Sequence, residues 1–172
     1  MKLFFNMNFI RSMLKVFPTI TAQAHCDIPC GIYDPTPAKI AAMTVLRTVL
    51  QIQEIQPPQG FPLSFDAVAM KSLFNSMTRR VAVKEEHAAI CKKELLILWT
   101  DFFKPEHLEK VPQLHDTFWK AAKLCSKNKQ EINEKAAREL VDAVDEIAKV
   151  FYDIKGVHER YDAYKTLTEK LF

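Results

Sequence analysis

The sequence predicts an all-α protein folded as an antiparallel four-helix bundle, and three observations support that prediction. The chain has only three glycines in 172 residues, so the tight turns that β-hairpins need are scarce. Apolar residues recur at steps of three and four along separate segments, which is the period of an amphipathic helix. Hydrophobic residues make up 48% of the chain, enough to fill one core of ordinary size. Four such helices with short connections favour an antiparallel bundle.

The first predicted helix begins in the turn Asp34-Pro35-Thr36-Pro37. Thr36 is expected to cap it, and Pro37 is expected at the first helical position, where a missing N–H costs nothing. Its predicted apolar face consists of Ile40, Met43, Leu46 and Leu50. We expect the helix to end near Gln56, because residues 57–62 hold three prolines and a glycine.

The second predicted helix is long, with Ser64 as its expected cap. Its apolar stripe advances in steps of three, four and seven through Leu73, Met77, Val81, Ala88, Cys91, Leu95, Leu98 and Phe102. We expect it to end at Lys104-Pro105, because the residue before a proline avoids the helical region.

Two further helices and a tail complete the predicted bundle. The third starts at Pro112, and its apolar positions are Leu114, Phe118, Ala121 and Cys125. The polar residues 126–129 are expected to form a loop. The fourth carries the stripe Ile132, Ala136, Leu140, Ala143, Val144, Ile147, Phe151 and Ile154. After Gly156 the tail either continues as a helix or packs across a subunit boundary, and the sequence leaves both open.

The first 24 residues differ from the rest of the chain. They hold three basic residues and no acidic one, and Ala22 and Ala24 flank a plausible cleavage point before His25. Polar side chains interrupt the apolar stretch, which leaves a secretory signal, a removable pro-segment and an organellar presequence open. We expect a processing protease to remove residues 1–24. Residues 25–172 then form one domain in the cytoplasm, or in an exported or organellar location if the leader is a targeting signal.

The formal charge of +3 belongs to this leader. Removing its three basic residues from the 24 lysines and arginines leaves 21, which balance the 21 acidic residues. A neutral body has no surface that tracks phosphates, so we expect no nucleic-acid partner. No apolar run reaches the roughly 18 residues that a membrane span needs, so we expect no membrane partner.

The chemistry is concentrated in residues 25–33, called the hook, which read His-Cys-Asp-Ile-Pro-Cys-Gly-Ile-Tyr. If cleavage frees the amine of His25, that amine, the amide nitrogen of Cys26 and the Cys26 sulfur close two fused five-membered chelate rings around one metal ion. A tight reversal at the intervening proline and the following glycine would bring the sulfur of Cys30 round as a fourth ligand.

This donor set selects the metal. Two nitrogens and two thiolates in one plane favour a square-planar ion, Ni(II) or Cu(II), over the tetrahedral zinc ion. Thiolates and a deprotonated amide are electron-rich donors that stabilise Ni(III), which brings the nickel couple within reach of superoxide. The imidazole of His25 is a candidate axial ligand in the oxidised state.

In these residues the chain resembles the nickel superoxide dismutases, whose mature proteins begin with His-Cys-Asp-x-Pro-Cys-Gly-x-Tyr. Residues 25–33 match that motif at every fixed position. Residues 98–107, Leu-Trp-Thr-Asp-Phe-Phe-Lys-Pro-Glu-His, are similar to the segment between the family's second and third helices. Weaker similarity continues through the predicted bundle.

The resemblance implies a homohexamer in which each chain binds one nickel ion and disproportionates superoxide to oxygen and hydrogen peroxide through a Ni(III)/Ni(II) cycle. It implies that His25 supplies an amine and an imidazole, Cys26 an amide and a thiolate, and Cys30 a thiolate. It also places Asp27 and Tyr33 beside the metal, with Tyr33 gating access and ordering water.

The chain departs from the family pattern at two positions. Better-known members orient the axial imidazole with a glutamate from the first helix and an arginine from the second, where this chain has Ala41 and His87. The nickel ligands are unchanged, but the orientation and basicity of the imidazole depend on such neighbours. The insertion around residues 57–63 and the longer tail also exceed the shorter family members.

Other interpretations of the hook stay open beside the nickel enzyme. Cys26 and Cys30 could form a structural disulfide or a thiol-redox pair, or the hook could serve a non-enzymatic helical nickel-binding or interaction protein. The adjacent His25 and the proline, glycine and tyrosine of the motif favour the nickel hook. Cys91 and Cys125 lie on apolar stripes and are expected to be inert core thiols.

Three further histidines and two lysines are also considered as site residues. His107, His115 and His158 have no ligand spacing and are expected to be solvated or to cap helices. Lys84 and Lys104 are candidates for drawing anionic superoxide toward the metal, although lysines on bundle surfaces are usually solvated.

Overall fold

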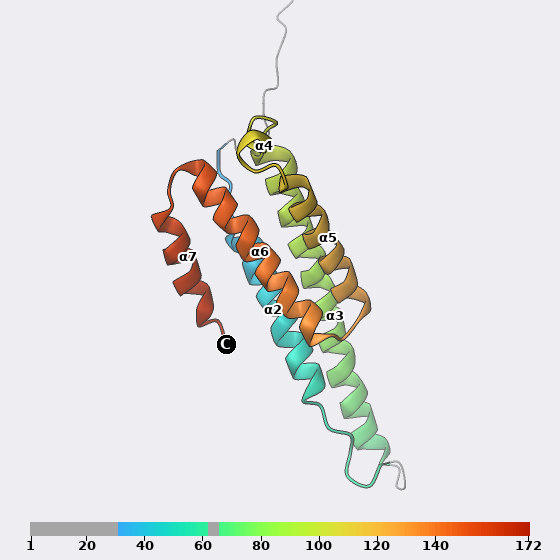
Figure 1. Cartoon of the computed structure of the whole chain (residues 1–172). Helices are drawn as coiled ribbons and strands as arrows, with labels where there is room; N and C mark the ends of the chain where they lie inside the picture. Colours follow the sequence, from blue (N-terminus) through green and yellow to red (C-terminus); the bar gives the residue numbers. More distant parts are fainter. Residues whose placement is uncertain (1–30, 62–65) are drawn as a thin grey trace, which may run out of the picture. The chain divides into compact units, whose positions relative to one another are not determined.

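The computed structural model describes residues 31–61 and 66–172. All regular structure in these residues is helical, which confirms the predicted fold class (Figure 1). In chain order the elements are α2 (Thr36–Gln53), α3 (Ala67–Ile97), the π-helical turn η1 (Leu98–Phe102), α4 (His107–Lys110), α5 (Leu114–Gln130), α6 (Glu134–Lys155) and α7 (Glu159–Glu169). The predicted metal ligands lie outside the described residues.

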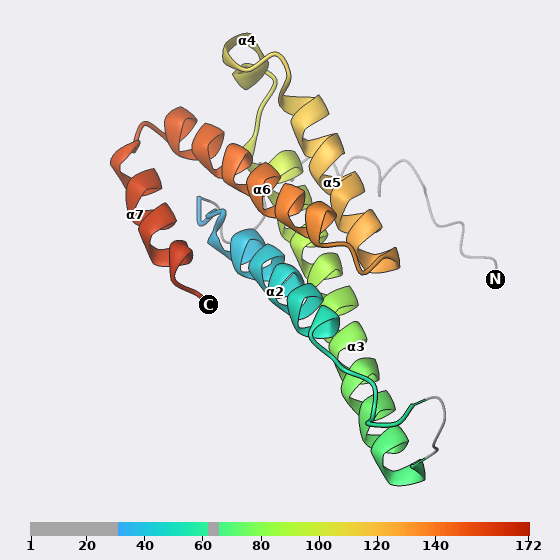
Figure 2. The ribbon, with the colours of Figure 1, turned by 60° about the horizontal axis from the view of Figure 1, so that its bottom comes forward.

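Four of these helices form the bundle around one core. α2 packs against α3 and α6, and α5 packs against the same two helices, with successive members of the bundle running in opposite directions (Figures 1 and 2). The core is apolar, and its largest fully buried apolar side chains include Phe118, Phe151, Leu95, Leu114, Leu140 and Ile147. The antiparallel four-helix arrangement is therefore as the sequence predicts.

Helix α2 begins and packs differently from the prediction. Thr36 is its first residue rather than its cap, and Asp34 Oδ1 accepts hydrogen bonds from the Thr36 amide at 2.9 Å and from the Thr36 hydroxyl. Ile40 is 50% exposed, so that part of the predicted face was wrong. The predicted Leu46 is buried, but the rest of the buried apolar face consists of Ile52 and the smaller residues Ala38, Ala41, Ala42, Val45 and Val49. Small side chains allow α2 to approach its neighbours closely, but they give a weak hydrophobic signal in the sequence.

Helix α3 is long, as predicted, and continues through η1 to Phe102 before the Lys104-Pro105 pair. Its cap is Asp66, whose Oδ1 accepts from the amides of Val68 and Ala69 at 2.9 and 3.1 Å. The predicted cap, Ser64, lies outside the described residues. The first turns of α3 extend past the end of α2, so the early part of its stripe is only partly buried (Figures 1 and 2).

The predicted loop at residues 126–129 was wrong, because α5 runs on to Gln130. Two polar side chains bury themselves at this end instead of facing water. The side-chain amide of Asn128 donates to the carbonyls of Leu124 and Ala136, both at 2.9 Å. Lys84 Nζ donates to the carbonyls of Asn128 and, at 2.9 Å, Lys129. Buried polar residues that hydrogen-bond to the carbonyls at a helix end cannot be distinguished from loop residues in the sequence.

The tail after α6 forms a helix that packs on its own chain. Gly156 ends α6 with φ of +73°, a left-handed conformation that glycine adopts without strain. The chain then turns back, and α7 lies along α6 and α2 (Figure 2). Tyr164 on α7 is 3% exposed, which shows that the helix is seated against the bundle.

Candidate metal centre and the stem that carries it

The structure describes the chain from the residue that follows the last predicted ligand. His25, Cys26, Asp27 and Cys30 therefore lie outside the described residues, and their predicted roles stay predictions. Residues 31–35, called the stem here, are the last three residues of the hook and the two residues that connect it to α2. Gly31 in the stem has φ of +85°, which fits the sharp change of direction expected after Cys30.

Tyr33 is the predicted site residue that the structure does place. It is partly buried against the core, and its ring centroid lies 6.0 Å from that of Phe102 in η1. Its carbonyl accepts a hydrogen bond of 3.5 Å from Lys155 Nζ at the end of α6. Tyr33 thus lies beside η1 and the end of α6, shortly before α2 begins.

The aromatic residues beneath Tyr33 form a packed cluster. Phe102 lies 4.4 Å from Phe151 and 5.0 Å from Phe103, measured between ring centroids. Phe151 is fully buried and Phe103 is 8% exposed. Tilted and edge-to-face rings at these distances attract one another beyond the burial of their area. The cluster gives Tyr33 a rigid apolar support.

Asp34 is a stem residue whose role the sequence reasoning missed. Its Oδ2 accepts from the hydroxyl of Tyr152 at 3.2 Å and lies 3.7 Å from Nη2 of Arg160. Burial, with a further contribution from the charge of Asp34, raises the pKa of Tyr152, so this phenol stays a hydrogen-bond donor at neutral pH. In the sequence Asp34 indicated only a turn, because Tyr152 and Arg160 lie more than 100 residues later.

The described residues offer no alternative metal site. Within residues 31–61 and 66–172 there is no group of three or more His, Cys, Asp or Glu side chains that could hold a metal ion. Cys91 and Cys125 are buried thiols of α3 and α5. A hydrogen bond with Cys125, together with burial, raises the pKa of the Cys91 thiol, so that thiol is protonated at neutral pH. Both cysteines are fully buried, as expected for core thiols.

Whether the chain suits nickel therefore depends on the donor atoms of the hook. Two thiols, one imidazole and, after processing, one amine fall within six consecutive residues, 25–30. Soft thiolate and nitrogen donors in this number suit a square-planar or tetragonal ion such as nickel. The donor set and the metal fit each other.

The two positions that depart from the family pattern are both described. Ala41 is 1% exposed in the packed face of α2 and presents no polar group. His87 on α3 is partly buried, and its Nδ1 is buried without a hydrogen-bond partner among the described residues. The ring of His25, which the family's arginine at this position helps to orient, lies outside the described residues.

The other candidate histidines have local roles. His107 Nδ1 accepts from the amide of Lys104 at 3.1 Å, and His115 Nδ1 accepts from the indole N–H of Trp99 at 2.8 Å. His158 Nδ1 lies 2.6 Å from Asp153 Oδ1. These contacts confirm the expectation of solvated or capping histidines.

The two candidate lysines separate clearly. Lys84 is 1% exposed and caps the end of α5, so it was wrongly considered for drawing superoxide from solution. Lys104 is exposed just after η1, and its part in attracting the anion stays a prediction.

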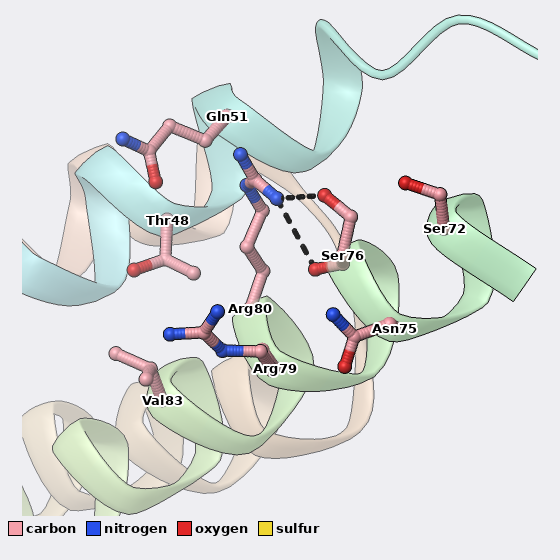
Figure 3. A pocket seen from close by; sticks show the side chains of 8 residues that line it. All are labelled: Thr48, Gln51, Ser72, Asn75, Ser76, Arg79, Arg80 and Val83. Atoms are coloured by element: carbon pink, nitrogen blue, oxygen red, sulfur yellow. Dashed lines mark hydrogen bonds between the residues drawn. The ribbon is translucent and has the colours of Figure 1, made fainter.

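A polar pocket lies elsewhere on the bundle, between α2 and α3 (Figure 3). It measures about 480 Å³, and Arg79 and Arg80 share its lining with hydroxyl and amide side chains. Arg80 Nη1 donates to the carbonyl of Ser76 at 3.2 Å and to its hydroxyl (Figure 3). No thiol, imidazole or carboxylate lines this pocket, so it has no donors for nickel. Thr48 and Gln51 in its lining lie about 18 Å or more along α2 from the stem.

Comparison with known proteins gives a consistent result. Residues 20–155 match the family model described as nickel-containing superoxide dismutase. Superoxide dismutase [Ni] of Streptomyces coelicolor (strain ATCC BAA-471 / A3(2) / M145) is 33% identical over 138 residues, which cover 80% of this chain and 93% of the relative. The protein of the same name from Streptomyces seoulensis gives the same figures.

Solved structures agree with the sequence relatives. The native nickel superoxide dismutase structure at 1.30 Å is 30% identical and has a TM-score of 0.63, covering 76% of this chain and 99% of that one. A structure of nickel-containing superoxide dismutase with nickel ligation of the oxidised state is also 30% identical, with a TM-score of 0.62 and coverage of 77% and 99%. The family match ends at residue 155, so α7 and the C-terminus lie beyond it.

Proposed function

This chain belongs to the nickel-containing superoxide dismutase family, a family of nickel-dependent oxidoreductases that disproportionate superoxide, and we propose that His25, Cys26 and Cys30 hold its metal. The family, the activity and the need for nickel confirm what residues 25–33 predicted. The ligand positions rest on the donor set of the hook and on the family match, which spans all of residues 25–33.

Each ligand residue has a defined task in this proposal. The freed amine of His25 and the amide nitrogen of Cys26 supply the nitrogens, and the thiolates of Cys26 and Cys30 supply the sulfurs. Nickel bound by these groups supplies a one-electron couple between Ni(II) and Ni(III), which superoxide can both reduce and reoxidise. Two superoxide ions and two protons give one oxygen and one hydrogen peroxide.

Other hook residues position groups around the substrate. Tyr33 restricts access and orders water with its phenol, and Asp27 lies beside the ligands. The packed rings of Phe102 and Phe151 beneath Tyr33 support the first of these roles, because they limit the directions in which its side chain can turn. The protons for peroxide then come from ordered water and solvent.

Processing, assembly and location belong to the same proposal. Removal of residues 1–24 by a protease is required, because an amine blocked by a peptide bond is not a ligand. We propose a homohexamer, and large exposed side chains such as Val68 at 78% and Phe74 at 61% offer apolar surface for subunit contacts. We propose the cytoplasm as its location, with export or an organelle as the alternative if the leader directs targeting. Among the described helices, none is long and apolar enough to cross a membrane.

Native mass spectrometry with metal analysis tests the proposal directly. The mature chain should begin at His25 and carry about one nickel ion, and Cys26→Ser or Cys30→Ser should lose nickel and at least about 100-fold of the activity. Cys91→Ala is the matched control, since its thiol is buried in the core and should leave the nickel content unchanged. A processed protein with full nickel that consumes no superoxide would instead indicate a nickel carrier. An active chain that retains its leader would exclude the amine as a ligand.

A further inference from the structure

The C-terminal segment beyond the family match is tied firmly to the bundle. The match ends at residue 155, and the family relatives are nevertheless covered over 93% of their length, so α7 is an addition in this chain. Tyr164 and Thr168 on α7 are 3% and 4% exposed. An added helix that buries these two residues this completely is seated against the bundle.

A buried polar junction holds α7 in place. The hydroxyl of Tyr164 donates to Asp145 Oδ1 on α6 at 2.8 Å, and Lys39 Nζ on α2 donates to both oxygens of the same carboxylate at 2.7 Å. Lys39 is 5% exposed, so this ion pair is largely shielded from water. Burial and the charge of Asp145 raise the pKa of Tyr164, which keeps its hydroxyl a donor. The junction joins α7 to two helices of the bundle.

The first turn of α7 reaches the stem of the hook. Arg160 Nη2 lies 3.7 Å from Asp34 Oδ2, and its guanidinium lies 5.9 Å from the ring centroid of Tyr152. Tyr152 is 2% exposed and donates to the same Asp34 oxygen. Arg160 therefore lies between a fixed aromatic ring and the one carboxylate of the stem.

Asp34 is four residues after Cys30 in the chain. Asp34 thus belongs to the described segment through which the proposed ligands are joined to α2. We propose that Arg160 is a positioning residue of the metal hook, and that α7 and Tyr152 together act as a brace which fixes the stem through Asp34. This inference rests on the proposed ligands, because it concerns how the chain presents them to nickel.

The expected effect is moderate in size because the ion pair is not buried. The side chains of Arg160 and Asp34 are 55% and 36% exposed, and an ion pair of this kind changes an equilibrium by about threefold to fivefold. The effect should nevertheless concern the metal site specifically, since the stem is the covalent connection between α2 and the proposed ligands.

Amide hydrogen exchange on the processed protein without metal tests the brace itself. Exchange at the amides of Tyr33, Asp34 and Thr36 should be about threefold to fivefold faster in Arg160→Gln than in wild type, and Arg160→Lys should restore part of the protection. Arg138→Gln is the matched control, because Arg138 is an exposed arginine on α6 paired with Glu134 at 2.8 Å. Exchange in the cores of α3 and α5 should not change in any of these variants.

Nickel binding tests whether the brace acts on the hook. Arg160→Gln should release nickel to a chelator about threefold to fivefold faster than wild type and should broaden the electron paramagnetic resonance signal of the oxidised metal, while Arg138→Gln should match wild type. Unchanged stem exchange and unchanged nickel release in Arg160→Gln would overturn the positioning role alone. A wild-type processed chain that binds no nickel would overturn the proposed ligands and the positioning role with them.

Discussion

The two ends of α6 handle polar groups in opposite ways. At the start of α6, Asn128 is fully buried and Lys84 is 1% exposed, and their hydrogen bonds go to main-chain carbonyls of α5 and α6. At the far end, Asp34 and Arg160 keep about a third to a half of their side-chain surface exposed, and their ion pair links the stem to the first turn of α7.

The difference indicates which end contributes to folding and which to function. Buried donors at a helix end replace water that cannot reach the carbonyls, so losing one leaves polar groups unsatisfied and costs much stability. Half-exposed ion pairs contribute little to stability because water competes for both partners. Such a pair can still favour one orientation of a short segment such as the stem. Substitutions at the two ends should therefore separate stability from metal binding.

The largest expected effect is on stability, at the start of α6. Lys84→Met removes the donor to the carbonyls of Asn128 and Lys129, and we expect the free energy of unfolding to fall by about 2–4 kcal/mol. Urea unfolding of the protein without metal measures this loss. Lys93→Met is the control, since Lys93 is exposed on the same helix and should change stability by no more than about 0.5 kcal/mol.

The comparison would fail if Lys84→Met were as stable as wild type. That result would mean that water reaches the carbonyls at the end of α5, so this end would be as accessible to solvent as the stem. The nickel content of Lys84→Met, measured below its unfolding transition, should equal that of wild type.

An intermediate effect is expected where α7 joins the bundle. Tyr164→Phe keeps the buried ring but removes the hydrogen bond to Asp145, and we expect a loss of about 1 kcal/mol at pH 7. The pH dependence gives a second readout. The pKa of Tyr164 is raised in the folded protein, so the folded state keeps its proton above pH 10 while the unfolded chain loses it.

The sign of this effect follows from proton linkage. Stability from Tyr164 is fully present below the ordinary tyrosine pKa of about 10 and falls as the pH rises above it. Tyr152 and Tyr161 have raised pKa values as well and add to the same fall. Urea unfolding at about pH 8 and pH 10.5 should show a smaller decline for Tyr164→Phe than for wild type. Equal declines would show that Tyr164 does not contribute to it.

The sequence was most informative where the chemistry is local. Residues 25–33 place every proposed ligand within one short segment, so the family, the metal and the reaction could be predicted before any fold was known. The stripe of α6 was also clear, because apolar side chains repeat at helical spacing along it and most of them are buried. The all-α bundle followed from them.

The sequence was least informative where a role depends on distant partners. Asp34 and Tyr152 are separated by 118 positions, and nothing near Asp34 distinguishes a braced carboxylate from an ordinary turn residue. Most of the buried face of α2 was missed because small residues form it, although Leu46 was predicted correctly. Residues 126–129 resembled a loop because Asn128 is polar. In each case the missing information was the surface that the fold brings against the residue.

The smallest expected effect on stability is at the stem, where a substitution should change nickel release but hardly change the free energy of unfolding. Asp34→Asn keeps an oxygen that can accept from the Thr36 amide but removes the charge that faces Arg160, so the free energy of unfolding should change by less than about 1 kcal/mol. Nickel release should nevertheless be about threefold to fivefold faster, as for Arg160→Gln. The double variant Asp34→Asn/Arg160→Gln should release nickel no faster than either single variant, because both remove the same contact. Additive effects in the double variant would mean that Asp34 and Arg160 act on the hook separately. The stem would then have no single ion pair to compare with the buried hydrogen bonds at the end of α5.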